Sequence, residues 1–156
     1  MNNPTLAAQH GSRKASVANA YISAGTGKVN VRCSYNKRDL LNMKRQGKDL
    51  STIKKDFLPS EYFETVQAYN ATEFLLAPLV KIGKADKFNI TITVKGGGLK
   101  SQLEAAHLAI AKALVVIDPS YKPALSDDCR TDARKKERSK IGCRGKARRK
   151  VQFSKR

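Results

Sequence analysis

The clearest pattern of apolar and polar positions lies in residues 88–94, where the two kinds alternate strictly. This alternation predicts a strand with one face buried and the other facing solvent. Three glycines follow at 96–98, and over residues 99–117 large apolar side chains then recur every three or four positions. That spacing predicts an amphipathic helix of about five turns that packs on the sheet and ends at Asp118-Pro119.

Weaker patterns predict two further strands. Residues 15–23 combine small and β-favouring side chains, and residues 29–31 alternate again. The glycines in residues 25–28 favour a tight turn that joins the two segments as a β-hairpin. A Gly-x-Gly-Lys segment can also form a phosphate-binding loop, but the strand patterns on both sides favour the hairpin.

A second helix is predicted between these strands and residues 88–94. Thr72 is the expected N-cap, and Gly83 is expected to end the helix. Pro78 should limit it to its first turn or kink it. About three strands with helices between and after them predict an α+β fold, a two-layer sandwich with helices on one face of the sheet and solvent on the other.

The chain divides into a flexible N-terminal lead-in at 1–12, a domain at 13–128 and a tail at 129–156. A basic insertion at about 33–60 interrupts the domain. Within it, Leu50, Ile53 and Phe57 have the spacing of one helical face, which Pro59 would end. This insertion is either a solvated surface excursion or an auxiliary contact with RNA or protein, and the residues leave both readings open.

The tail carries most of the positive charge. Residues 129–156 have a formal net charge of +11, out of +18 for the whole chain, and few large apolar side chains. Such a segment has too little apolar surface to offset its ordering entropy, and self-repulsion favours an extended chain until a polyanion supplies counter-charge. Strong basicity concentrated in this way indicates a nucleic-acid partner.

Other classes of partner and site are disfavoured. No apolar run approaches the roughly 20 residues that span a bilayer, so we expect no membrane association. Cys33, Cys129 and Cys143 are odd in number and widely spaced, and the histidines are distant, so we expect reduced thiols and no metal site. We also expect no cofactor and no small-molecule substrate.

Three features invite an enzymatic reading. The segment from Gly96 to Ser101 resembles a nucleotide-binding loop, but Leu99 stands where that motif needs a glycine before its lysine. His107 lies at the edge of its helix's apolar face, and Asp127-Asp128 suits a turn or cap better than a catalytic pair. We therefore expect no enzyme, and a small nucleotide-dependent enzyme using residues 96–101 is the disfavoured alternative.

Short motifs along the chain resemble the ninth-protein family of the small ribosomal subunit, of bacterial and organellar type. The match covers about residues 11–32 and 61–156, and the terminal Gln-Phe-Ser-Lys-Arg is its most specific part. The other matching motifs are Gly11-Ser12-Arg13-Lys14-Ala15-Ser16-Val17-Ala18, Gly25-Thr26-Gly27-Lys28-Val29, Tyr62-Phe63, Pro78-Leu79, Lys87-Phe88-Asn89-Ile90, Gly96-Gly97-Gly98, Gln102 with Ala105, Ile110-Ala111-Lys112-Ala113-Leu114, Arg134-Lys135-Lys136-Glu137-Arg138 and Lys146-Ala147-Arg148-Arg149.

This resemblance implies a structural constituent of the small subunit. The fold implied is that of the second domain of small-subunit ribosomal protein five, with a mixed sheet and a left-handed β-α-β connection. The domain would bind the 3′ major domain of small-subunit rRNA in the head, beside neighbouring head proteins. The tail would thread between rRNA helices to the anticodon stem-loop of the peptidyl-site tRNA. A free RNA-binding or RNA-chaperone protein is the alternative that the charge alone allows.

The expected contacts are cations, glycine amides and one aromatic side chain. By the resemblance, Ser154, Lys155 and Arg156 would contact tRNA. The residues expected to bind rRNA are Arg13, Lys14, Lys28, Lys95, Gly97, Gly98, Lys100, Arg130, Arg134, Lys135, Lys136, Arg138, Lys140, Arg144, Lys146, Arg148, Arg149, Lys150, Gln152 and Phe153.

Some positions depart from the family pattern. The 33–60 insertion has no counterpart in the family's short link, Lys100-Ser101 replaces the usual Ser-Gly, and His107 replaces a common Arg. An insertion in an otherwise bacterial-type chain suggests an organellar ribosome, with a mitochondrion favoured over a plastid. A bacterial cytoplasm is the alternative.

Overall fold

The alternating segment forms β5 (Phe88–Lys95), the central strand of a five-stranded sheet with the order β1-β2-β5-β3-β4. Its four apolar side chains are buried, and the polar side chains between them are partly exposed. β5 pairs antiparallel with β2 and parallel with β3, so the sheet is mixed. The strand predicted from the alternation is confirmed, and with it the α+β class.

The computed structural model describes residues 4–33, 45–46, 56–63, 70–143 and 147. The other strands are β1 (Thr5–Arg13), β2 (Ser16–Ala24), β3 (Val29–Cys33) and β4 (Asp56–Phe57). The helices are α2 (Pro59–Tyr62), α3 (Ala71–Ile82), α4 (Leu99–Ile117) and the short 3-10 helix η1 (Pro119–Tyr121).

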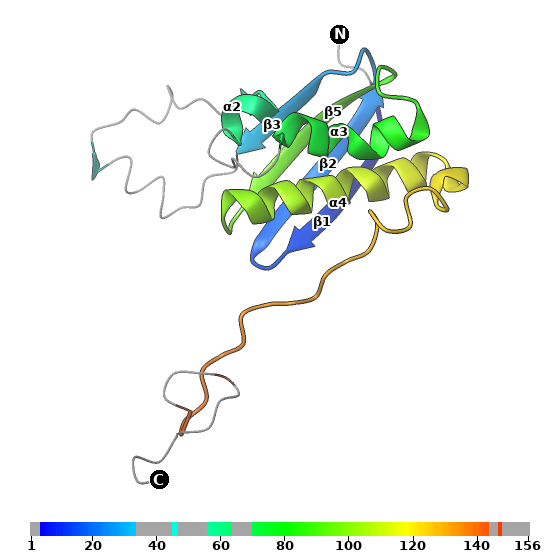
Figure 1. Ribbon diagram of the computed structural model, residues 1–156. Helices are drawn as coiled ribbons and strands as arrows, with labels where there is room; N and C mark the ends of the chain where they lie inside the picture. Colours follow the sequence, from blue (N-terminus) through cyan, green and yellow to red (C-terminus); the bar gives the residue numbers. More distant parts are fainter. Residues whose placement is uncertain (1–3, 34–44, 47–55, 64–69, 144–146, 148–156) are drawn as a thin grey trace.

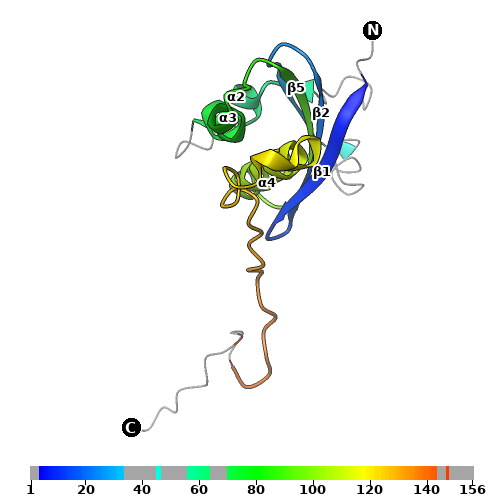
Figure 2. The same cartoon turned by 90° about the vertical axis from the view of Figure 1, so that its right-hand side faces the viewer.

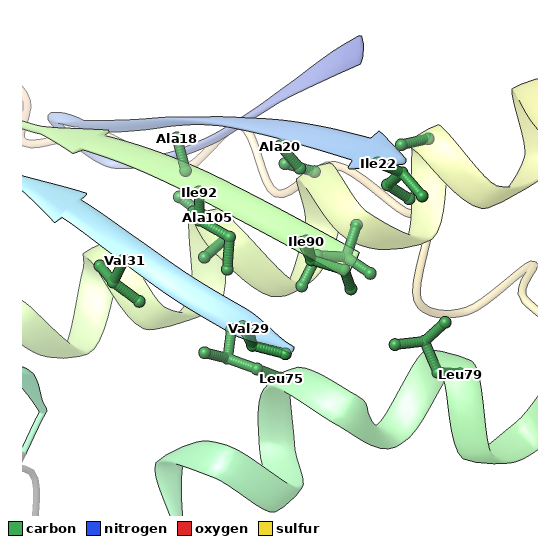
Figure 3. Packing of buried hydrophobic residues seen from close by; sticks show 14 of the residues in the cluster. Ala18, Ala20, Ile22, Val29, Val31, Leu75, Leu79, Ile90, Ile92 and Ala105 are labelled. Carbon is green, nitrogen blue, oxygen red and sulfur yellow. The ribbon is translucent and has the colours of Figure 1, made fainter. Parts of the chain in front are cut away.

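Helices α2, α3 and α4 lie on one face of the sheet (Figures 1 and 2). Leu103, Ile110 and Leu114 of α4 are at most 1% exposed, as the predicted spacing of its apolar face requires. Figure 3 shows Leu75 and Leu79 of α3 directed toward side chains of the sheet, among them Ile90 and Ile92. Each fully buried aliphatic side chain stabilises the domain by roughly 1.5–3 kcal/mol relative to exposure.

The lead-in predicted at 1–12 is wrong for most of its length, because β1 occupies residues 5–13. β1 pairs along β2, and only Ala7 and Gly11 of this strand are buried. A Cβ atom on Gly11 would lie 2.2 Å from the carbonyl oxygen of Ala105, so α4 crosses β1 too closely for larger side chains. The strand therefore lacks the large apolar alternation by which it could have been predicted.

The predicted β-hairpin of 15–23 with 29–31 is also wrong. The strands exist as β2 and β3, but β5 lies between them. The connecting glycine segment runs along β5 instead of turning tightly: Gly25 donates its N–H to the Lys87 carbonyl at 3.0 Å. The Asn89 side-chain oxygen accepts hydrogen bonds from the backbone N–H groups of Thr26 and Lys28. This long-range pairing leaves no local signal in the sequence.

The helix predicted at 72–82 forms as α3, but its details differ. Asn70 is the N-cap instead of Thr72, and Gly83 ends the helix in the left-handed conformation as predicted. Pro78 does not limit the helix to its first turn, since eight of its residues precede or include the proline and four follow it. Pro78, Leu75 and Leu79 are buried against the core, and this burial offsets the missing backbone hydrogen bond.

The expected helical face of the insertion is wrong where it can be checked. Phe57 belongs to β4, and Pro59 begins α2 instead of ending a helix. Proline suits the first helical position because the N–H group it lacks has no intrahelical acceptor there. Leu50 and Ile53 lie outside the described residues.

Candidate nucleic-acid interface

Three lysines converge at one end of the sheet. Lys14 lies in the β1–β2 turn, Lys95 ends β5, and Lys100 is in the first turn of α4; all three are exposed. The turn and the segment after β5 are neighbours, because Val17 pairs with Lys95 and Gly96 approaches the Ala15 carbonyl. We call Lys14, Lys95, Lys100 and the backbone amides of residues 97–100 the basic end.

Lys28 does not belong to the basic end. It follows the opposite end of β2 from Lys14, and a nine-residue strand spans roughly 27–30 Å. Lys28 is exposed beside the segment that leads into β5, where its backbone N–H is bonded to Asn89. The predicted domain residues thus fall at two separate places.

The glycine turn of the basic end is held by two buried polar side chains. Ser16 Oγ and Gln102 Nε2 both donate to the Gly96 carbonyl, at 3.1 and 2.9 Å. Gln102 also accepts a hydrogen bond from the Tyr62 hydroxyl at 3.0 Å. Gly97 has φ of 64°, and a Cβ there would lie 1.9 Å from Ser16 Oγ. The segment is a tight turn from β5 to α4.

Neither Ser16 nor Gln102 was predicted as a site residue. Both are less than 9% exposed in a domain whose other buried residues are mostly apolar. The available signal was a polar residue at a position that the strand and helix periodicities assign to the interior, where a polar group needs a partner. The partner, Gly96 O, became evident only with the fold.

Gly98 differs from its two glycine neighbours. Its φ of −109° suits any residue, and a Cβ atom there would meet nothing within 4 Å. Gly98 is the N-cap of α4, and the first N–H groups of an α-helix have no intrahelical acceptors. Amides at the positive end of a helix dipole suit a phosphate oxygen, which a side chain at position 98 would obstruct.

The tail begins beside the same end of the domain. Leu125 is fully buried, and Cys129, which donates its N–H to the Leu125 carbonyl, packs partly against the core. After Asp132, residues 133–143 run away from the domain (Figures 1 and 2). The six described tail cations are all exposed: Arg130, Arg134, Lys135, Lys136, Arg138 and Lys140.

The remaining predicted tail residues lie outside the described part of the chain. They are Arg144, Lys146, Arg148, Arg149, Lys150, Gln152, Phe153, Ser154, Lys155 and Arg156. Their assignment to rRNA and tRNA stays a prediction.

Arg13, by contrast, is engaged within the protein. Its guanidinium contacts Glu104 at 2.8 Å and Asp132 at 3.1 Å, and its side chain is only 16% exposed. Asp132 lies in the tail and is also held by Arg134, whose Nη2 is 2.6 Å away. Hydrogen bonds from Arg134, assisted by the charge of Arg13, hold the pKa of the Asp132 carboxyl well below its usual range.

His107 occupies the boundary between α4 and its neighbours, as expected. Its ring lies on Phe74 with centroids 4.5 Å apart, and Nε2 is 3.9 Å from an Asp128 oxygen. Burial lowers the pKa of His107, although the charge of Asp128 opposes that shift. Asp128 itself pairs with Lys81 at 2.6 Å, so it supports a turn at the base of the tail.

The described residues contain neither a candidate metal cluster nor a candidate membrane-spanning helix. Within these ranges, no group of three or more His, Cys, Asp or Glu side chains is placed to hold a metal ion. No helix in this part of the chain is both long and apolar enough to cross a membrane. Cys33, Cys129 and Cys143 are separate free thiols.

A sequence model of the family described as ribosomal protein S9/S16 matches residues 45–156. The chain belongs to this family. Small ribosomal subunit protein uS9 of Porphyromonas gingivalis is 40% identical over 148 residues, which cover 94% of each chain. The proteins of the same name from Bacteroides fragilis and Amoebophilus asiaticus are 39% and 36% identical, again over 94% of each chain.

These comparisons change the interpretation of the insertion. The S9/S16 match begins at residue 45, inside the 33–60 segment, and the named relatives have nearly the same length as this chain. The expectation that the segment has no counterpart in the family is therefore wrong. It was the reason for favouring an organelle, and the named relatives are bacterial, so the mitochondrial preference is unsupported and the bacterial alternative fits.

Proposed function

We propose that the chain is a structural constituent of the small ribosomal subunit that binds small-subunit rRNA through the basic end and the tail. Membership of the S9/S16 family supports this role. The observation that carries the proposal is the set of exposed cations on residues 130–140, a segment without regular structure that leaves the domain. Exposed cations at this density bind phosphates and release counterions, largely independently of base sequence.

The basic end adds a second anchoring point on the domain. Lys14, Lys95 and Lys100 supply charge, while the N-terminal amides of α4 after Gly98 are suited to donate to a phosphate oxygen. By the resemblance, the partner is the 3′ major domain of the rRNA in the subunit head, together with neighbouring head proteins. The bacterial relatives support a bacterial ribosome as the particle.

The tail tip is proposed to reach the peptidyl-site tRNA. Support comes from the terminal Gln-Phe-Ser-Lys-Arg motif and from length. The chain from Arg130 to Arg156 spans at most roughly 85–95 Å when extended, several times the ~13 Å radius of gyration of a domain this size. Ser154, Lys155 and Arg156 are the proposed contacts with the anticodon stem-loop.

Association with the particle tests this function. Small subunits are reconstituted with the full-length chain or with a chain ending at residue 132, then sedimented at rising salt. We expect the full-length protein to remain stoichiometric with the subunit at salt concentrations that strip loosely bound proteins, and the truncated chain to dissociate earlier. Loss of the full-length protein with the loosely bound fraction would instead favour a free RNA-binding or RNA-chaperone protein.

A further inference from the structure

The base of the tail is tied to the domain by an alternating row of four charges. Glu104 of α4 accepts from Arg13 Nε at 2.8 Å, and Arg13 Nη2 lies 3.1 Å from Asp132. Asp132 in turn accepts from the Arg134 side chain and from the Arg134 backbone N–H at 2.9 Å. The row joins three parts that are far apart in sequence: the end of β1, the first half of α4 and the tail.

The guanidinium of Arg13 is well suited to such a junction. Its planar fork holds two carboxylates at once, which a lysine ammonium on a flexible stem does less specifically. The side chain is 16% exposed, whereas that of Arg134 is 82% exposed. Arg13 Nη1 is fully buried and has no hydrogen-bond partner among the described residues, so this atom faces protein instead of a surface that RNA could reach.

A second contact lies immediately before the row. Lys112 of α4 donates from Nζ to the Thr131 hydroxyl at 3.1 Å. The tail is thus attached at two successive residues, Thr131 to α4 and Asp132 to Arg13 at the end of β1. Both follow the buried Leu125 and the half-buried Cys129. Beyond Arg134 the described tail cations are exposed.

We propose that Arg13, Glu104 and Asp132 form a clamp that sets where and in which direction the basic tail leaves the domain. Arg13 is then a positioning residue for tail binding, acting through Asp132, and not a phosphate contact. The clamp starts the tail next to Lys14 of the basic end, so that both meet one continuous stretch of RNA. This inference rests on the proposed function, since it assigns a role within tail-dependent rRNA binding.

The physical benefit of the clamp is that the basic tail samples a smaller volume before it meets RNA. A tail with a fixed starting point and direction has a higher effective concentration at an RNA groove beside the basic end than a tail that begins to move directly after Cys129. An acid in a segment of net +11 weakens the attraction to RNA by one charge. The negative charge of Asp132 therefore lowers the RNA affinity, whereas its role as an anchor of the tail raises it.

That opposition allows a test with matched variants of the full-length chain. Asp132→Asn and Glu137→Gln each remove one negative charge from the tail, five residues apart. Affinity is measured for an RNA fragment comprising the 3′ major domain of small-subunit rRNA. We expect Glu137→Gln to bind slightly more tightly and Asp132→Asn to bind about three- to tenfold more weakly, despite its extra positive charge.

The free protein supplies an independent readout. Heteronuclear NOE values of the backbone amides of residues 131–136 report their motion on the ps–ns timescale. In the unmodified chain and in Glu137→Gln, residues 131–134 should be as rigid as the domain. In Asp132→Asn they should be as mobile as residue 136, while Asp132→Glu should restore rigidity and affinity in part. Melting temperature and circular dichroism confirm that the domain is folded in each variant.

Arg13→Lys supplies the domain-side comparison, because one ammonium cannot hold Glu104 and Asp132 in the same fork geometry. We expect it to mobilise residues 131–134 and weaken RNA binding at unchanged net charge. Equal tightening of binding by Asp132→Asn and Glu137→Gln, with unchanged NOE values, would overturn the clamp. If instead a chain ending at residue 132 bound the RNA as tightly as the full-length protein, the proposed function itself would fail.

Discussion

The domain and the tail obtain their order from opposite sources. In the domain, α4 and β5 bury rows of apolar side chains, and removal of this surface from water holds the elements together. In the tail, residues 133–142 are exposed and carry repelling cations. The domain therefore folds by its own contacts, whereas under the proposed function the tail obtains its counter-charge from RNA. Substitutions in the two regions should change different measured quantities.

The largest effect is expected in the core. Leu114 is fully buried between α4 and the sheet, so Leu114→Ala should reduce the free energy of unfolding by about 2–5 kcal/mol through lost burial and a residual cavity. Urea denaturation followed by circular dichroism measures it. The salt dependence of RNA binding by the folded fraction should not change; a changed slope would mean that core and tail are coupled.

Removing the tail should have the complementary effect. For the full-length chain, the logarithm of rRNA affinity should fall with the logarithm of salt concentration at a slope of order −4 to −6, if about half the tail cations meet phosphates. A chain ending at residue 132 should bind about a hundredfold more weakly at low salt and with a shallower slope. Its melting temperature should be unaltered. A full-length slope near −1 would show that the tail charge is not used.

Substitutions at two neighbouring glycines of the basic end, Gly97 and Gly98, should affect folding and RNA binding separately. Gly97→Ala should destabilise the domain by about 1–3 kcal/mol, because it puts a side chain at positive φ and against Ser16. Gly98→Ala should leave the melting temperature unchanged and weaken rRNA binding severalfold, since only an approaching phosphate would meet its methyl group. Equal binding by Gly98→Ala and the unmodified chain would remove position 98 from the interface.

Deleting Lys155 and Arg156 should give a smaller and more selective effect. Subunits reconstituted with this variant should assemble normally but bind peptidyl-site tRNA a few-fold more weakly, because two charged contacts are lost. Filter binding of tRNA to the isolated subunits measures this. Unchanged tRNA affinity would refute the assignment of the tip while leaving the rRNA role intact.

The smallest effect concerns pH. The pKa of His107 is lower in the folded protein than in the unfolded chain, so the unfolded chain binds the proton more readily. Stability should therefore be unaffected by His107 well above pH 6.5 and should decrease as the pH falls below that value. His107→Gln removes this dependence while His10 remains in both chains, so the difference between their stability–pH curves isolates His107.

Local sequence patterns predicted the elements in which buried residues recur with the period of the strand or helix itself. Residues 88–94 and 99–117 each pack one face on the same core, so a period of two or of three to four residues was sufficient. β1 was not predicted, because its close approach to α4 at Gly11 excludes the large apolar side chains that would have indicated a strand. The order of the strands in the sheet could not be predicted, because the β2–β5 and β3–β5 pairings join residues about 60 or more positions apart.

The candidate site divides in the same way. Its cations and glycines were predicted from charge and motifs, and all of those in the described residues except Arg13 are exposed. The separation of Lys28 from Lys14, the support of Gly96 by Ser16 and Gln102, and the pairing of Arg13 with Asp132 were not predicted. Each depends on residues brought together from distant parts of the chain, and a side chain's type does not specify its partner.

The sequence alone determined what the two regions are: a domain with an apolar core, and a thread whose charge cannot be neutralised by the residues it contains. The apolar core and the excess charge of the tail are both properties that add up over residues close in sequence, so composition and periodicity are sufficient to predict them. The tertiary structure decided how they are joined, with β5 between β2 and β3 and with Asp132 held against Arg13 at the domain's end. Such choices depend on long-range complementarity of shape and charge, which exists only once the chain has folded.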